Sequence, residues 1–386
     1  MKAGIITMHK VPNFGSHLQA YALQESVKKL GYDTELIDYK YPNEYHIARD
    51  KDLAKKKISL VRIIKFVFKL PITIFNRVIY TRQIKLFHDF ENNFFNLSYL
   101  YDSQEEIKKE KPSYDIYITG SDQVWNPRFA CGDDIYMCNF GDFSKSRIAY
   151  GASVAATSIP ESMKAIYKQN LSRYKSIGIR DASSKETLEK ITEKSIDVVC
   201  DPVFLRNSSD WENISKLSNL KLPKKYILVY ILTYSFEPYP QIISIIKDVK
   251  KVFDLPVVFV NTSLRHYFQV KPYKNIYTAS VPDFLKLFAN ASFILTTSFH
   301  GTAFSLIFHR QFLSIINDNK KDSRISDLQK TIGLNNYSTI KDYSISILNK
   351  KIDYEIINNN IELMIKKSWI FLKSSLEINQ EIKSEL

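Results

Sequence analysis

The chain has 386 residues, of which 45% are hydrophobic and 25% charged, so it is long enough to bury two cores. Only 10 Gly and 13 Pro are present, which excludes a collagen-like or low-complexity chain. Lys and Arg number 54 against 41 Asp and Glu, and the formal net charge is +13. This charge either indicates polyanions, membrane surfaces or anionic substrates as partners, or reflects a composition rich in Lys, Ile and Asn.

The three cysteines, Cys131, Cys138 and Cys200, form no CxxC pair, which favours structural thiols in a reducing compartment. The apolar run at the N-terminus is too short for a signal peptide. No window of about 18 apolar residues is free of charge, so no transmembrane helix is expected. The sequence therefore predicts a cytoplasmic protein.

Short runs of β-branched and aromatic residues alternate with amphipathic helical patterns along the chain. In the first half, strands are expected at 3–8, 34–39, 114–119, 147–153, 176–179 and 196–200, and helices at 16–30, 161–174 and 183–191. In the second half, strands are expected at 226–232, 257–260, 293–297 and 312–316, and helices at 241–253 and 301–309. Such alternation is typical of parallel sheets covered by helices on both faces. The predicted fold class is therefore α/β, with two Rossmann-like domains facing each other across a cleft.

A polar stretch at 207–223 separates the two halves of this pattern. We expect an N-terminal Rossmann-like domain over residues 1–206, a second Rossmann-like domain over 207–350, and a C-terminal helix and tail over 351–386. A helical basic insertion at about 50–98 interrupts the first domain.

The insertion is distinguished by its charge. From residue 53 to residue 88 the sequence holds nine basic and no acidic residues. Three of them, Arg62, Lys65 and Lys69, share one face of a helix that Pro71 is expected to end. Such a helix either lies in the interface of an anionic membrane or packs on the core with a solvated basic face.

Two loops in the first half follow predicted strands. Asn13 and Gly15 precede the first helix, where they would let the backbone approach a ligand, although turns use both residue types in any case. In the second loop, Asp122 could accept a proton from a hydroxyl and Trp125 could stack on a sugar. The alternative is that Ser121 or Asp122 merely caps the next helix. No GxGxxG or GxxxxGK[ST] motif is present, which argues against the dehydrogenase and kinase classes.

Two further loops carry cationic or titratable side chains. Arg180 leaves a strand toward a helix start, where its guanidinium suits a phosphate or carboxylate, unless it forms a structural pair with Asp181. His300 opens a helix, so its imidazole could shuttle a proton beside free backbone N–H groups, unless it is a structural histidine. Arg324 offers another guanidinium at a later helix start. No His, Cys and Asp cluster has the spacing of metal ligands.

Four short motifs occur in order along the chain: Asn13-Phe14-Gly15-Ser16-His17-Leu18-Gln19-Ala20-Tyr21-Ala22-Leu23, Gly120-Ser121-Asp122-Gln123-Val124-Trp125-Asn126, Ile179-Arg180-Asp181 and Ser298-Phe299-His300-Gly301. Together they resemble the polysaccharide pyruvyl transferase family. The resemblance spans residues 3 to 335, and the basic insertion and the C-terminal helix are not part of it.

The resemblance implies two Rossmann-like domains arranged as in GT-B glycosyltransferases, with the active site in the cleft. It also implies phosphoenolpyruvate as donor, without a cofactor, and a sugar of a capsular or other surface polysaccharide precursor as acceptor. The product would be a pyruvate ketal that bridges two hydroxyls of one sugar. A lipid-linked oligosaccharide as acceptor would explain the basic insertion, through peripheral contact with the anionic inner face of the cell membrane.

By motif, Arg180 and His300 match the donor-binding residues of the family, and Asp122 lies in its cleft-lining loop. His300 is the expected acid, Asp122 the expected base, and Arg180 the expected ligand of phosphate or carboxylate. The family often has Arg where this chain has Ser298, and we hypothesise that Arg324 supplies the missing guanidinium. The residues expected to bind substrate are Arg180, Arg324, Ser298, Gly301, Asn13, Gly15, Ser121 and Trp125.

Other functions are less well supported. A GT-B glycosyltransferase would use a nucleotide sugar, but no nucleotide-binding constellation is visible in the second half. A family member that has lost catalysis would keep only a binding role, which Ser298 makes conceivable. Nucleic-acid binding is disfavoured, because the basic residues concentrate in one insertion and no helix-turn-helix, RRM or zinc signature is present.

Overall fold

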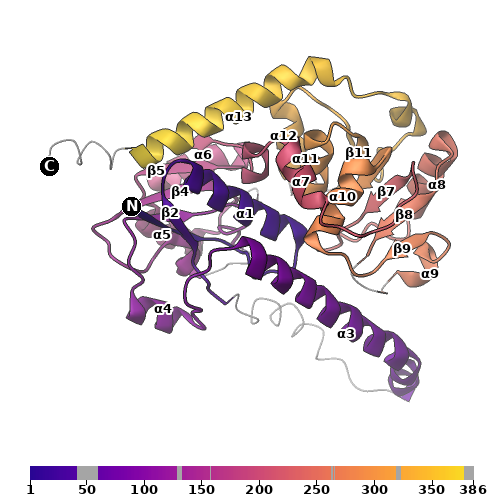
Figure 1. The fold of residues 1–386 in the computed structure, drawn as a ribbon, viewed down its shortest axis with the longest axis horizontal. Coiled ribbons are helices and arrows are strands. Elements are labelled where there is room, and N and C mark those ends of the chain that lie inside the picture. Colours follow the sequence, from indigo (N-terminus) through magenta and orange to yellow (C-terminus); the bar gives the residue numbers. More distant parts are fainter. Residues whose placement is uncertain are drawn as a thin grey trace.

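Two parallel sheets of six strands each form the framework of the fold, seen in a computed structural model of the chain (Figure 1). The structure describes residues 1–40, 60–127, 133–156, 158–261, 264, 266–318 and 323–377. Helices cover the sheets, and the predicted α/β class with two Rossmann-like domains is confirmed.

The first sheet has the strand order β2-β1-β3-β4-β5-β6, and all neighbouring strands are parallel. Its strands are β1 (Lys2–Ile6), β2 (Asp33–Leu36), β3 (Ile116–Thr119), β4 (Ser146–Ala152), β5 (Ser176–Ile179) and β6 (Asp197–Val198). The chain order reverses at β1, which lies between β2 and β3. Ligands of open α/β sheets bind outside the carboxyl ends of the strands at such a reversal.

The second sheet has the strand order β12-β11-β10-β7-β8-β9 and is also parallel throughout. Its strands are β7 (Ile227–Tyr230), β8 (Val257–Val260), β9 (Lys274–Ile276), β10 (Phe293–Thr296), β11 (Gln311–Ile316) and β12 (Tyr337–Thr339). Its central strands β7, β8 and β10 are fully buried apolar runs, which is the pattern of strands covered by helices on both faces. The order reverses between β7 and β10.

The helices alternate with the strands along the chain. In the first domain they are α1 (Phe14–Lys29), α3 (Leu60–Phe94), α4 (Gln104–Glu110), α5 (Glu161–Leu171) and α6 (Lys185–Thr192). In the second half they are α7 (Ser208–Ser215), α8 (Ile242–Phe253), α9 (Tyr267–Val270), α10 (Val281–Asn290), α11 (Phe299–Ile307), α12 (Arg324–Thr331) and α13 (Tyr354–Glu377). Short 3₁₀ helices are η1 (Asp134–Met137), η2 (Ala182–Ser184), η3 (Pro202–Leu205) and η4 (Ile345–Asn349).

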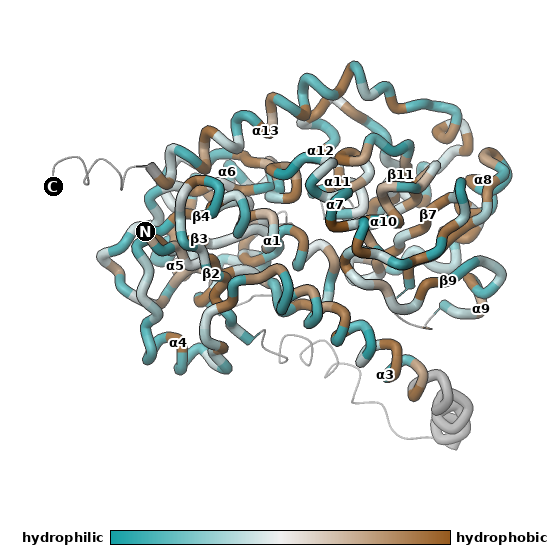
Figure 2. Tube along the Cα trace, in the orientation of Figure 1, coloured by the Kyte–Doolittle hydropathy of each residue, from teal (hydrophilic) through white to brown (hydrophobic). Residues whose placement is uncertain are grey.

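One apolar core is shared by the two domains, and each sheet adds a further apolar cluster. Figure 2 shows apolar and polar residues alternating along the helices, as in α13. Phe14 at the start of α1 stacks on Phe284 of α10, with ring centroids 4.6 Å apart, and lies edge-on to Tyr230 of β7. Trp211 of α7 lies edge-on to Phe304 of α11 at 5.4 Å. The first helix of the chain is therefore packed directly against the second domain.

The long helix α3 projects away from both sheets in Figure 1, yet its inner side contacts both domains. Gln83 exchanges two hydrogen bonds with the backbone of Ala279 in the second domain, at 2.7 and 3.1 Å. Phe87 stacks on His17 of α1 at 4.5 Å.

The expectation that Pro71 ends this helix is wrong, because α3 is continuous from Leu60 to Phe94. A proline removes one backbone hydrogen bond, and the packing of the later turns against both domains outweighs that loss. Arg62, Lys65 and Lys69 lie outside the residues whose side chains the structure describes.

The last described helix, α13, crosses from the second domain back to the first (Figure 1). Tyr32 donates its hydroxyl to the Leu376 carbonyl at 2.7 Å, and the Cys200 amide donates to Ser368 Oγ at 2.8 Å. The strands of the first sheet end at Val198 and those of the second begin at Ile227, and the expected boundary at 206–207 falls between these strands. Among the described helices, none has the length and apolar character needed to span a bilayer.

Candidate active site

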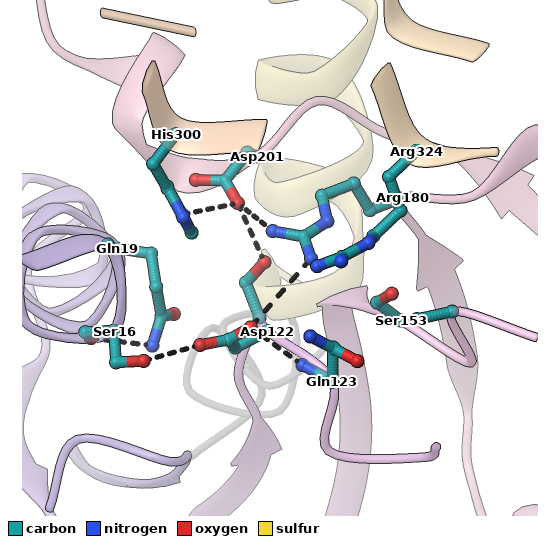
Figure 3. Close-up of polar contacts among 12 residues, drawn as sticks. Ser16, Gln19, Asp122, Gln123, Ser153, Arg180, Asp201, His300 and Arg324 are labelled. Atoms are coloured by element: carbon teal, nitrogen blue, oxygen red, sulfur yellow. Dashed lines mark hydrogen bonds and ion pairs between the residues drawn. The ribbon is translucent and has the colours of Figure 1, made fainter. Parts of the chain in front are cut away.

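Polar side chains from the carboxyl ends of both sheets meet between the two domains (Figure 3). The first domain contributes Ser16, Ser121, Asp122, Arg180 and Asp201, and the second contributes His300 and Arg324. The sequence singles out all of these side chains except Ser16 and Asp201, and the fold brings them into one cluster.

Asp201, which follows β6, is the centre of the cluster and is only 1% exposed. Its Oδ2 accepts a hydrogen bond from Arg180 Nη1 and lies 3.2 Å from Ser121 Oγ and 3.5 Å from His300 Nε2. Burial alone would raise the pKa of Asp201, but the charges of His300 and Arg180 hold it well below its ordinary value. A carboxylate that stays ionised therefore joins the Arg of one domain to the His of the other.

Sequence reasoning missed Asp201, although a signal was present. Asp201 comes directly after the strand expected at 196–200 and before Pro202, and its Oδ1 accepts a hydrogen bond from the Val203 amide at the start of η3. Asp-Pro after an apolar run indicates a helix cap. That pattern does not reveal the cationic partners, because they come from other strands.

Arg180 follows the last residue of β5, and part of its guanidinium forms no hydrogen bond with the described residues. Its side chain is buried, its guanidinium lies 4.3 Å from the centroid of the Phe299 ring, and its Nη2 lies 3.9 Å from Asp122 Oδ1. Within the described part of the chain, Nε and Nη2 have no hydrogen-bond partner. A buried guanidinium with two unsatisfied nitrogens is well suited to an anion.

The alternative of a structural Arg180–Asp181 pair finds little support. The Asp181 carboxylate accepts hydrogen bonds from Ser153 Oγ at 2.6 Å and from the Ala155 amide at 2.8 Å, and no ion pair joins Asp181 to Arg180 in the described residues. Burial raises the pKa of Asp181, and the charge of Arg180 opposes this rise. Asp181 thus holds the loop that contains Ser153 and Ala155, whereas the Arg180 guanidinium faces Asp201 and Asp122.

His300 lies in the first turn of α11 and is buried against the start of α1. A Cβ atom built on Gly15 would lie 1.9 Å from His300 Nδ1, which is far inside van der Waals contact. Only glycine therefore allows the imidazole to approach the backbone of the first domain this closely. Nε2 of His300 has no hydrogen-bond partner with good geometry among the described residues, although it faces Asp201.

Asp122 occupies the loop after β3 in a left-handed conformation, with φ of 76°, which is uncommon for a residue other than glycine. Its Oδ2 accepts a hydrogen bond from Ser16 Oγ at 2.6 Å, and its Oδ1 accepts one from the Gln123 amide at 2.9 Å. The side chain therefore supports its own turn, although the described residues 123–127 form no helix for it to cap, and it also faces the Arg180 guanidinium.

Ser298, Gly301 and Asn13 shape the loops around the cluster. Ser298 is the N-cap of α11 and accepts from the Gly301 amide at 3.2 Å, and Asn13 is the N-cap of α1 and accepts from the Gly15 amide at 2.8 Å. A Cβ on Gly301 would lie 2.3 Å from Thr296 Oγ1, so this glycine lets α11 pack closely on β10. The structure gives these three residues local structural roles at the site.

Arg324, the first residue of α12, is buried and reaches the cluster from the second domain. Its Nη2 lies 3.5 Å from Tyr234 Oη, and Figure 3 shows its side chain beside that of Arg180. Close by, Ser183 of the first domain donates its amide to Asp327 Oδ2 of α12 at 3.2 Å. The charges of Arg180 and Arg324 both oppose the rise in the pKa of Asp181, so guanidinium groups of both domains reach the same part of the site.

Trp125 lies outside the cluster, and its predicted role in stacking on a sugar is wrong. The indole is fully buried, donates Nε1–H to the Tyr136 carbonyl at 3.2 Å, and lies edge-on to Tyr174. Its ring is part of the apolar cluster of the first domain, so it has no face to present to a ligand.

A pocket of about 330 Å³ opens on the Arg180 side of the cluster. Its lining includes Arg180, Asp201 and Phe299, together with Leu328 of α12 and Met364 of α13. This volume is at the small end of the range for ligand sites, which suits a compact anion.

Comparison with solved structures shows the same fold at low sequence identity. S. aureus MnaA, solved with UDP, is 13% identical with a TM-score of 0.51, and the match covers 94% of this chain and 91% of that one. UDP-GlcNAc 2-epimerase from Neisseria meningitidis, bound to UDP-GlcNAc, is 10% identical with a TM-score of 0.50, and the match covers all of both chains. The two domains are thus arranged as in GT-B enzymes. No curated protein matches the chain.

The family model for polysaccharide pyruvyl transferase matches residues 13–319, a span that contains every residue of the cluster except Arg324. The expectation drawn from the four sequence motifs is thereby confirmed: the chain belongs to the polysaccharide pyruvyl transferase family.

Proposed function

We propose that the chain transfers the enolpyruvyl group of phosphoenolpyruvate to two hydroxyls of one sugar in a cell-surface polysaccharide precursor. The product is a cyclic pyruvate ketal, and inorganic phosphate is released. The observation that carries the proposal is the buried Arg180 guanidinium beside a histidine–aspartate pair at the domain junction. Its Nε and Nη2 have no hydrogen-bond partner among the residues that the structure describes. Membership of the family supports the same reaction class.

In the proposed donor complex, Arg180 and Arg324 bind the carboxylate and the phosphate of phosphoenolpyruvate. Each guanidinium can donate two parallel hydrogen bonds to such an anion. The amides in the first turn of α11 add further donors and the positive end of a helix dipole. Arg324 would supply the charge that the family commonly draws from the position of Ser298.

His300 is the proposed acid. It donates a proton to the methylene carbon of the donor, which leaves a cationic, oxocarbenium-like centre at the adjacent carbon. Asp201 lies 3.5 Å from the ring and balances the charge of its protonated form, because its own lowered pKa keeps it ionised.

Asp122 is the proposed base on the acceptor, held in place by the hydrogen bond from Ser16. One sugar hydroxyl attacks the cationic carbon, the bond from that carbon to the phosphate oxygen breaks, and the second hydroxyl closes the ring. The two hydroxyls each lose a proton. One proton restores the protonated form of His300, which gave its own proton to the new methyl group, and the other leaves with phosphate. The atoms balance without an oxidant or reductant.

The test is calorimetric titration of phosphoenolpyruvate, and separately of nucleotide sugars, into the wild type and single variants. Arg180→Ala is expected to weaken phosphoenolpyruvate binding by about 1.5–3 kcal/mol, the worth of a charge-assisted contact, and Arg324→Ala by a similar amount. His300→Gln is expected to keep most of the binding and to lose transfer. Arg173→Ala is the matched control, because Arg173 bonds to Asn139 in the first domain and not to any residue of the cluster.

Two outcomes would contradict the proposal. Tight binding of a nucleotide sugar with no binding of phosphoenolpyruvate would assign the site to glycosyl transfer. Binding of phosphoenolpyruvate with no ketal formed on any acceptor would indicate a member of the family that has lost catalysis. Unchanged affinity in Arg324→Ala would refute the replacement of the missing Arg by Arg324.

We also propose that the acceptor sugar is carried on a lipid-linked oligosaccharide and that the chain works in peripheral contact with the inner face of the cell membrane. The run of nine basic residues without an acidic one between residues 53 and 88 supports this setting.

A further inference from the structure

Two turns of α3 carry large apolar side chains that face outward. The exposed fractions are 57% for Ile74, 50% for Phe75, 40% for Val78 and 57% for Tyr80. The opposite side of the same turns is fully engaged, since Ile79 is buried and Gln83 binds the Ala279 backbone. An apolar side on a helix that is already packed by its other side indicates a further contact surface.

Basic residues are interleaved with these apolar ones on the same side of the helix. Arg77 and Arg82 are exposed, and neither makes an ion pair with another described residue. They follow Ile74 and Val78 by three and four positions, which puts them on the same face. From residue 74 to residue 88 the sequence contains no acidic residue.

We propose that the outer face of α3, formed by Ile74, Phe75, Arg77, Val78 and Arg82, docks on an anionic membrane surface. A helix with apolar and basic side chains on one exposed side lies in the interface of such a membrane, with its apolar groups among the acyl chains and its cations at the headgroups. Association of two copies through this face would bring like charges together, which disfavours a dimer as the occupant.

Because α3 contacts both domains, its docking on a membrane would fix the position of the whole molecule. Besides Gln83, Asn76 Oδ1 accepts a hydrogen bond from the Leu264 amide of the second domain at 2.7 Å, and Phe87 packs on α1 beside Phe14. A membrane-bound α3 would therefore hold both domains at the lipid surface. This inference deepens the proposed function, because it names the surface through which an enzyme acting on a lipid-linked acceptor would contact the membrane. The biological reason for docking rests on the proposed function, whereas vesicle binding itself does not.

The experiment is co-sedimentation of the full-length protein with phosphatidylcholine vesicles, with and without phosphatidylglycerol. The wild type is expected to bind only the anionic vesicles, and less so at high salt. Arg77→Gln combined with Arg82→Gln is expected to weaken binding about thirtyfold. Combined Ile74→Ser, Phe75→Ser and Val78→Ser are expected to weaken it at least tenfold.

Matched controls come from α13, which lies at the opposite edge of the molecule in Figure 1. Ile356→Ser, Leu363→Ser and Ile370→Ser together remove three similarly exposed aliphatic side chains and should leave vesicle binding unchanged. As a direct reporter, Phe75→Trp should shift its emission to the blue on anionic vesicles, and Ile370→Trp should not.

Three results would overturn the inference: wild-type protein that ignores anionic vesicles, α3 variants that bind as tightly as the wild type, or a dimer in solution that the serine variants dissociate. Because the vesicles contain neither phosphoenolpyruvate nor a sugar, failure here would leave the phosphoenolpyruvate titration untouched. If phosphoenolpyruvate fails to bind, the result of the vesicle experiment is likewise unaffected.

Discussion

At the scale of single residues, Gly15 is the point where the two halves of the site touch. Its missing side chain leaves room for the His300 ring, since a Cβ there would lie 1.9 Å from Nδ1. Gly15→Ala is expected to displace the imidazole by about an ångström and to lower turnover about a hundredfold, because proton donors act only at the correct distance. The measurement is steady-state transfer together with thermal unfolding.

Gly31→Ala is the control for this change. Gly31 ends α1 with φ of +91°, so alanine there strains the backbone, but a Cβ would contact nothing within 4 Å and the position is remote from His300. This variant should lose some stability and keep its turnover. If Gly15→Ala loses no more activity than Gly31→Ala, the close approach of Gly15 to His300 has no role in the reaction.

The sequence indicates the cationic and titratable residues of the site better than it indicates the residues that position them. Arg180 and His300 could be found because each follows a predicted strand and has a side chain suited to anions or protons. Asp201 could not be assigned its role, since its partners come from β5 and from the second domain. The role of Trp125 could not be predicted for a similar reason. An aromatic side chain in a loop can either stack on a ligand or pack in the core, and the sequence does not distinguish the two.

At the scale of elements, strands were predicted well, because fully buried parallel strands are short apolar runs that stand out from helical patterns. The edge strands β9 and β12 were missed, since they are only three residues long and carry polar side chains. The polar stretch after residue 206 contains a short helix, α7, which Asn207 caps through the Asp210 amide. Polar composition alone did not reveal it, because exposed helices are polar as well.

The attachment of α3 to the first domain is electrostatic as well as apolar, and it provides a pH-dependent test. Burial acts to raise the pKa of Glu91, but the hydrogen bond and charge of His17 and the charge of Lys10 lower it from 4.5 to about 2. A carboxyl whose pKa is lowered on folding stabilises the protein above its ordinary pKa, and this stabilisation is lost as the pH falls toward 2. The shift corresponds to about 3 kcal/mol.

Urea unfolding of the wild type and of Glu91→Gln between pH 5 and pH 2.5 would measure this contribution. The wild type should lose about 2 kcal/mol more than the variant over this interval, because the folded carboxyl is still partly ionised at pH 2.5. Glu25→Gln is the control, because Glu25 forms a surface pair with Lys28 and accepts a hydrogen bond from Gln24, and its replacement should leave the pH dependence of the wild type in place. Parallel pH profiles for the wild type and Glu91→Gln would show that Glu91 does not anchor α3.

At the scale of the whole molecule, the domains are joined by a common core, although the sequence pattern suggested two separate units on either side of a cleft. Periodicity reports which side of an element is buried, but it does not say against which element. The packing of Phe14 on Phe284, and the return of α13 to the first domain, could therefore be learned only from the structure.

This shared core predicts that the two domains unfold together. Phe14→Ala removes a buried ring that contacts Phe284 and Tyr230, and it should cost about 3–5 kcal/mol and separate unfolding into two transitions. The measurement is calorimetric unfolding, with Phe268→Ala, an exposed ring in α9, as a control that should keep a single transition. A single, unshifted transition in Phe14→Ala would mean that the domains are held together elsewhere, through α3 and α13, and that the ring beside Gly15 serves only to position the first turn of α1.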